Sequence, residues 1–65
     1  MTSHNEIVKV RGEEYKVIGI GEASRDPKFW GRRRFTLRKL HTMEIWLAYG
    51  KSVQHNSRLV KGQNK

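Results

Sequence analysis

The chain contains no cysteine, which excludes a disulfide framework and a thiolate zinc site. Long apolar runs are also missing. No stretch approaches the roughly 20 residues that span a bilayer, and the N-terminus carries no run of signal-peptide length. We therefore expect a protein of a reducing compartment, the cytoplasm of a bacterium, an archaeon or a virus-infected cell, with no membrane partner.

Apolar residues are scarce, at 35% of 65 residues, so the chain has material for one small hydrophobic core. A chain of this length buries only about 60% of the surface that its unfolded form exposes. We expect a single domain over residues 1–65, with an ordered core at about residues 5–50 and a basic, mobile tail at about residues 51–65.

Acidic residues are few and concentrated in the first part of the chain. Through Asp26 there are four bases and five acids, a net charge of 4 − 5 = −1. From Pro27 onward there are ten bases and one acid, a net charge of 10 − 1 = +9. A basic excess that is segregated in this way predicts a polyanion partner for the second part of the chain.

Two short β-branched segments at residues 6–11 and 15–20 predict a hairpin that turns over residues 11–14. Strict alternation in the second segment places Tyr15 and Val17 on one face and Ile18 and Ile20 on the other. Gly19 and Gly21 interrupt this segment. Glycine within a strand indicates a bulge or a sharp bend, which a small curled sheet needs.

Residues 35–49 have two interpretations. As a hairpin, Phe35 and Leu37 face inward on one strand and the alternating series Met43, Ile45, Leu47 and Tyr49 faces inward on the next. The alternative is a short helix that begins at a Thr42 cap and ends at Gly50. The hairpin fits the alternation better. After Gly50, residues 57–61 offer one brief closing strand.

The fold class that follows is mostly β, with about four or five strands, a long basic loop and a C-terminal tail. The order of short strand, turn, bent glycine-bearing strand, long loop and hairpin resembles small SH3-like or OB-like barrels. A curled antiparallel sheet without closure is the other form of the same expectation. The similarity is one of architecture, and no motif specific enough to transfer a function accompanies it.

Residues 28–34 combine the two chemistries that a nucleic-acid surface needs, cations for phosphates and flat rings for bases. Arg32, Arg33 and Arg34 follow Phe29 and Trp30 with only Gly31 between them. The alternative for the two rings is that they pack in the core, since so small a domain needs its large side chains there.

In the hairpin interpretation Trp46 points away from Ile45 and Leu47 and becomes a surface ring. Arg34 and Arg38 would border it on the neighbouring strand, which is typical of single-strand binders. The alternative is that a barrel wall or the tail covers the indole.

Catalytic and metal-binding patterns are weak. Residues 19–24 begin like a phosphate-binding glycine motif but end in Ser24, and no space remains for a dinucleotide fold. His4, His41 and His55 lack metal-ligand spacing. We expect no enzyme activity, no catalytic residue, no metal, no cofactor and no small-molecule substrate.

The sequence therefore predicts a DNA- or RNA-binding protein that works mainly through phosphates, with weak sequence specificity. The alternative partner is an acidic protein surface, bound by an adaptor or inhibitor, since aromatic and arginine side chains dominate such interfaces too. The candidate nucleic-acid-binding residues are Lys28, Trp30, Arg32, Arg33, Arg34, Arg38, Lys39, Trp46, Lys51, Arg58 and Lys61.

Overall fold

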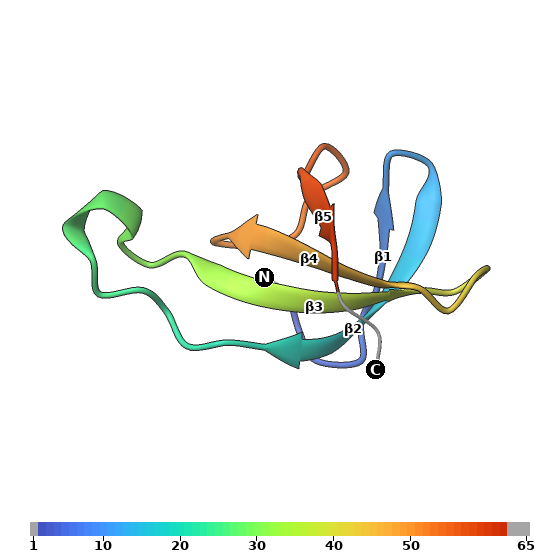
Figure 1. Ribbon diagram of the computed structural model, residues 1–65, viewed down its shortest axis with the longest axis horizontal. Coiled ribbons are helices and arrows are strands. Elements are labelled where there is room, and N and C mark those ends of the chain that lie inside the picture. The colour runs from blue at the N-terminus through green and yellow to red at the C-terminus, as the bar shows by residue number, and fades with distance from the viewer. Residues whose placement is uncertain (1, 63–65) are drawn as a thin grey trace.

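The computed structural model describes residues 2–62, which form one antiparallel five-stranded sheet and a single short 3-10 turn (Figure 1). The elements are β1 (Ile7–Val10), β2 (Glu13–Ile20), η1 (Pro27–Phe29), β3 (Arg33–Lys39), β4 (Ile45–Gly50) and β5 (Leu59–Lys61). Each strand pairs with the next one in sequence, which confirms the expected mostly-β, antiparallel class. No ladder joins β1 to β5 among these residues, so the sheet is unclosed, and the SH3-like or OB-like type stays a prediction.

A two-residue turn connects β1 and β2. Arg11 and Gly12 both have positive φ, 51° and 85°, and Val10 pairs with Glu13 across them. Two left-handed residues in a row define a type I′ turn, whose twist matches that of the flanking strands. The hairpin predicted at this place is confirmed, but its turn is tighter than residues 11–14, because Glu13 and Glu14 already belong to β2.

A bulge interrupts β2 where the glycines predicted one. The pairing with β3 shifts register between Val17 and Gly19, so that Ile20 pairs with Phe35. The extra residue, Ile18, reverses the alternation after it. The expectation that Ile18 and Ile20 share a face is therefore wrong, and Ile20 lies on the face of Phe35.

The core lies on one face of this bent sheet, here called the core face. Its buried residues are Val10, Tyr15, Val17, Phe35, Leu37 and Ala48. Phe35 and Leu37 face inward as expected, and Ala48 pairs with Phe35 so that a small side chain stands opposite a large one. Each fully buried Val, Leu or Phe contributes about 1.5–3 kcal/mol, so these few side chains dominate the stability of the fold.

The hairpin of β3 and β4 is confirmed over the helical alternative, but the faces of β4 are the reverse of the prediction. Trp46 pairs with Leu37 and packs against the core, whereas Ile45, Leu47 and Tyr49 lie on the outer face. The cause is the turn over residues 40–43, in which Met43 has a φ of 65° and is 56% exposed. Met43 therefore belongs to the turn and not to the inward series. This turn determines whether the odd-numbered or the even-numbered residues of β4 face the core.

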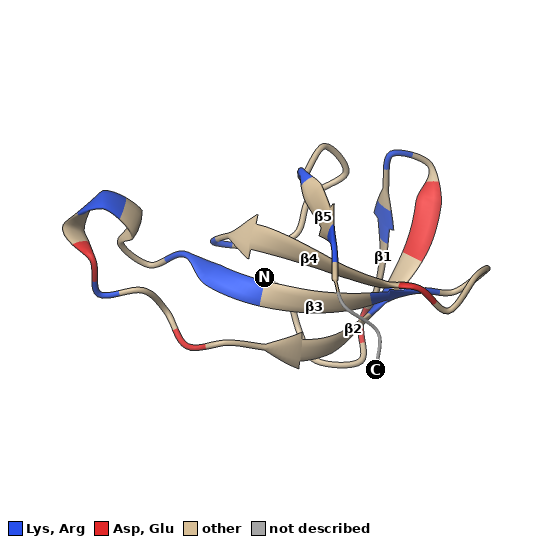
Figure 2. Ribbon diagram, viewed as in Figure 1, with Lys and Arg blue, Asp and Glu red and all other residues tan. Residues whose placement is uncertain are grey.

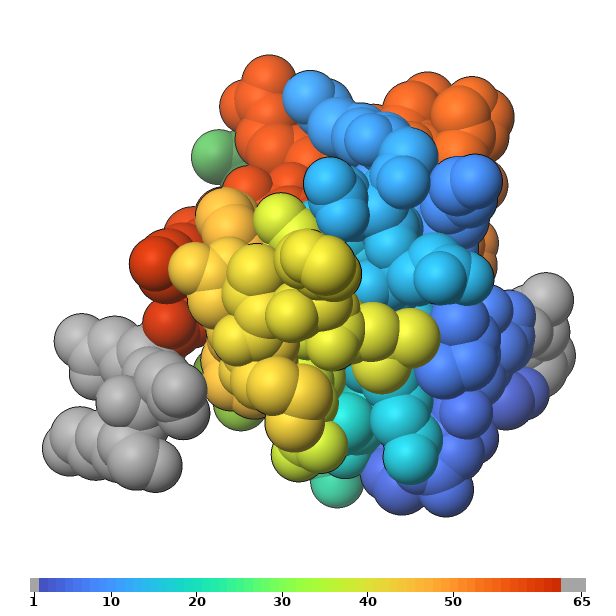
Figure 3. Space-filling model, turned by 90° about the vertical axis from the view of Figure 1, so that its right-hand side faces the viewer, coloured from blue at the N-terminus to red at the C-terminus, as the bar shows by residue number. Residues whose placement is uncertain are grey.

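The strand β5 and the loop before it complete the fold. Leu59 pairs with Ala48, inside the region expected to add a closing strand, and the backbone N–H of Arg11 donates to His55 O at 2.9 Å. At the end opposite the β2–β3 connection, the β3–β4 turn lies beside the β1–β2 hairpin (Figure 3), where Leu40 N donates to Glu14 O at 3.1 Å. Residues 63–65 of the predicted tail lie outside the described residues. Between residues 2 and 62, no helix has the length and apolar character to cross a membrane.

Candidate nucleic-acid interface

The connection between β2 and β3, residues 21–32, projects from the sheet as an arm (Figure 1). Backbone hydrogen bonds join its two limbs: Gly21 N donates to Arg34 O at 2.9 Å, Ser24 N to Arg32 O at 2.7 Å, and Gly31 N to Ser24 O at 3.1 Å. The arm thus extends the β2–β3 pairing beyond the strands. These hydrogen bonds hold the two limbs of the arm beside each other.

At the end of the arm the chain reverses through η1. The Asp26 carboxylate accepts a hydrogen bond from Lys28 N at 2.9 Å and caps the turn, while Pro27 supplies the fixed φ of its first position. No residue of η1 is buried. Phe29 and Trp30 are 47% and 67% exposed, so the alternative in which these rings fill the core is wrong.

The three consecutive arginines enter β3 from the base of the arm (Figure 2). Arg32 lies with its guanidinium 5.8 Å from the centre of the Phe29 ring, within the range of a cation–π contact. Arg33 donates from Nη1 to Gly21 O at 2.9 Å, which ties the base of the arm together. Arg34 pairs across the strands with Tyr49.

Lys51 joins these arginines from another part of the sequence. A Cβ built on Gly31 would lie 3.7 Å from Lys51 Cε, so this lysine lies against the arm. Arg33 and Lys51 also line one shallow hollow with Phe35. We call Arg32, Arg33, Arg34 and Lys51 the basic cluster; with Lys28 on η1, five of the predicted cations gather on and beside the arm.

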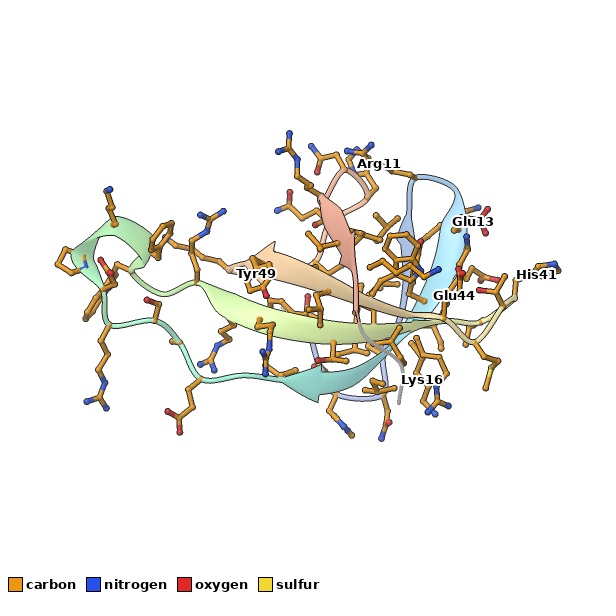
Figure 4. The ribbon with its side chains drawn as sticks, in the orientation of Figure 1. Arg11, Glu13, Lys16, His41, Glu44 and Tyr49 are labelled. Atoms are coloured by element: carbon orange, nitrogen blue, oxygen red, sulfur yellow. The ribbon has the colours of Figure 1, made fainter. Side chains whose placement is uncertain are left out.

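A second hollow, of about 390 Å³, lies between the arm and the end of β4. Its lining is mostly apolar and consists of Ser24, Phe29, Arg32, Arg33, Arg34 and Tyr49. Tyr49, at the end of β4 nearest the arm (Figure 4), is 54% exposed. Sequence reasoning missed this residue because it assigned Tyr49 to the core; only the register that pairs it with Arg34 places it here.

Between residues 2 and 62, no acidic side chain lies within salt-bridge distance of the cations of the basic cluster. Among residues 2–62 the one such ion pair joins Lys61 Nζ to Glu44 Oε2 at 3.2 Å. The hydrogen bond from Lys61 lowers the pKa of the Glu44 carboxyl below its ordinary value, and the Thr42 hydroxyl adds to this. Among residues 2–62, no acceptor lies within hydrogen-bond geometry of the buried indole N–H of Trp46. Lys61 is therefore engaged by an acidic side chain, unlike the cations of the basic cluster.

The other predicted residues lie away from the arm. Lys39, Trp46 and Arg58 line a separate hollow of about 380 Å³ at the β1–β2 end of the core face, and Arg38 pairs with Ile45 on the outer face. A platform in which Arg34 and Arg38 border Trp46 is therefore not formed, because the indole lies on the opposite face of the sheet.

No family model, no curated protein and no solved structure matches this chain. Among residues 2–62, no three His, Asp or Glu side chains gather as metal ligands. The geometry of the arm and the basic cluster is thus the basis for a functional proposal.

Proposed function

We propose that this protein binds nucleic acid, DNA or RNA, through the basic cluster and the arm. The observation that carries the proposal is the gathering of four cations, from two distant parts of the sequence, around a projecting arm with exposed rings. Phosphates are the partner that such a surface fits, because each phosphate neutralised by Lys or Arg releases condensed counterions.

The arginines suit phosphate binding better than charged side chains that only keep the surface hydrated would. A guanidinium offers a planar fork of donors that matches two phosphate oxygens, and the path of the arm fixes where each fork begins. Glu22 and Asp26 also lie on the arm, and the Asp26 carboxylate caps η1. The cations on and beside the arm outnumber these two acids, a net charge of 6 − 2 = +4, and they are Arg25, Lys28, Arg32, Arg33, Arg34 and Lys51.

The proposal is tested by the salt dependence of binding to a fluorescently labelled 20-nucleotide strand, measured by anisotropy. With about five phosphates neutralised, log K against log salt should have a slope of about −3.5 on a single strand and about −4.5 on a duplex. An affinity that does not change with salt would contradict the electrostatic mechanism.

A double variant, Arg32→Gln with Arg34→Gln, isolates the cluster. It leaves Arg33 in place because Arg33 binds the Gly21 carbonyl and supports the arm. We expect at least about tenfold weaker binding and a single-strand slope shallower by about 1.4. The matched control, Lys9→Gln with Lys16→Gln, removes the same charge from β1 and β2. Equal losses in the two variants would mean that net charge, and not this surface, determines binding.

A further inference from the structure

The hollow between the arm and β4, lined by Phe29, Tyr49 and the three arginines, has a chemistry that phosphate binding alone does not use. Two aromatic side chains line it, Phe29 from the arm and Tyr49 from the end of β4, and they are 47% and 54% exposed. Its volume of about 390 Å³ falls in the range of about 300–1,000 Å³ typical of ligand pockets. A surface that bound only phosphates would have no need for an apolar floor between its cations.

The arrangement of the rings indicates the ligand. Tyr49 lies on the outer face at the end of β4, and Phe29 lines the same hollow from the arm, with the Arg32 guanidinium 5.8 Å from the centre of its ring. A flat π-system entering the hollow meets an aromatic face and an arginine plane, the two surfaces on which unpaired bases stack. Arg32 and Arg34 at the rim would hold the phosphates on either side of that base.

We propose that this hollow is a receptor for one unpaired nucleobase of a single strand. The inference rests on the proposed function, and it adds that single strands are preferred over duplex at equal charge. A paired base is stacked within its helix and cannot enter the hollow, so duplex is left with the phosphate contacts alone.

The decisive comparison uses three probes with the same number of phosphates: an oligothymidylate, a strand of abasic tetrahydrofuran sites of the same length, and a duplex of half that length. We expect the wild-type protein to bind oligothymidylate about tenfold more tightly than the abasic strand. Equal affinity for these two strands would overturn the nucleobase receptor while leaving the proposed function intact. Failure to bind any of the three would overturn both.

Variants locate the stacking. Tyr49→Leu and Phe29→Leu should each lower affinity for oligothymidylate about tenfold and leave affinity for the abasic strand unchanged. Ile7→Ala is the matched control, because Ile7 is an exposed apolar side chain on β1 that does not line the hollow, and Trp30→Leu separately tests the exposed ring at the end of the arm. A loss on Trp30→Leu with no loss on the other two would move stacking to the end of the arm and contradict the proposal. The abasic comparison with wild-type protein requires no substitution, so it decides the question even if a variant fails to fold.

Discussion

Single side chains carry a large share of the stability of this domain, because the buried core of the described chain consists of six residues. Trp46 adds to that core from β4, opposite Leu37, and its indole nitrogen is enclosed without an acceptor. The two tryptophans are therefore in contrasting environments. Trp46 is packed against the core and Trp30 is 67% exposed on the arm.

Replacement of each tryptophan should show that Trp46 supports the fold and that Trp30 does not. Trp46→Ala should lower the free energy of unfolding by about 2–4 kcal/mol, somewhat less than the loss of a fully buried ring. Trp30→Ala should change it by less than about 0.5 kcal/mol. Urea denaturation followed by far-UV circular dichroism measures both. A Trp46→Ala protein that keeps its stability and loses only its affinity for oligonucleotide would restore the surface-platform hypothesis and contradict the placement of this ring.

The position of Trp46 also shows where sequence reasoning reaches its limit. Residues 45–49 are apolar at both parities, so alternation predicts a strand but not which face is buried. The turn at residues 40–43 determines which face of β4 is buried. In this turn Met43 adopts a left-handed conformation, which could not be predicted from a methionine. Phe35 and Leu37 were predictable because their neighbours, Arg34, Thr36 and Arg38, are all polar.

Among the elements, β5 depends most on a few polar contacts, since it is only three residues long. Gly62 N donates to Ile45 O at 2.8 Å just beyond it, and Lys61 pairs with Glu44 next to β4. A carboxyl whose folded-state pKa is lowered stabilises the fold above its unfolded-state pKa. That contribution is lost as the pH falls through the folded-state value.

The attachment of β5 should therefore weaken in acid. Lys61→Met should raise the pKa of the Glu44 carboxyl toward its ordinary value and reduce the loss of stability as the pH falls below about 4.3. The Thr42 hydroxyl remains, so the pKa of Glu44 should not return fully. Titration of the Glu44 carboxyl by NMR measures the shift directly. Lys51→Met removes a cation that has no acidic partner in the described structure, and an equal shift in that control would mean that the effect is not due to the pair.

The arm shows which residues of a candidate site can be found because they are close together in the sequence. Three arginines next to two aromatic residues identified Arg32, Arg33 and Arg34, and the structure keeps them together. Tyr49 and Lys51 reach the same place only through the pairing of β3 with β4 and the return of the chain after Gly50. Contacts of that kind depend on register, which composition and periodicity leave open.

Charge acts on the molecule as a whole, because a net charge of +8 is carried by only 65 residues. Like charges gathered on and beside the arm repel one another in the folded state more than in the expanded unfolded chain. Salt screens that repulsion, with a Debye length of about 10 Å at 0.1 M. Salt would also weaken the proposed binding to phosphates, so salt should act on folding and on binding in opposite directions.

We expect the melting temperature to rise by a few degrees between about 0.02 M and 0.5 M NaCl while the affinity for oligonucleotide falls steeply over the same range.

At low salt a saturating strand should raise the melting temperature as well, since a ligand at about 100 times its Kd stabilises the folded state by about 2.7 kcal/mol. Arg32→Gln with Arg34→Gln should reduce both the rise of the melting temperature with salt and the fall of the affinity with salt. The double variant removes the crowded charges and the proposed phosphate contacts together. Differential scanning fluorimetry across the salt series, with and without the strand, measures all of these effects. A melting temperature that falls steadily with salt would mean that attractive pairs such as Lys61–Glu44 outweigh the repulsion of the basic cluster, contrary to the charge distribution described above.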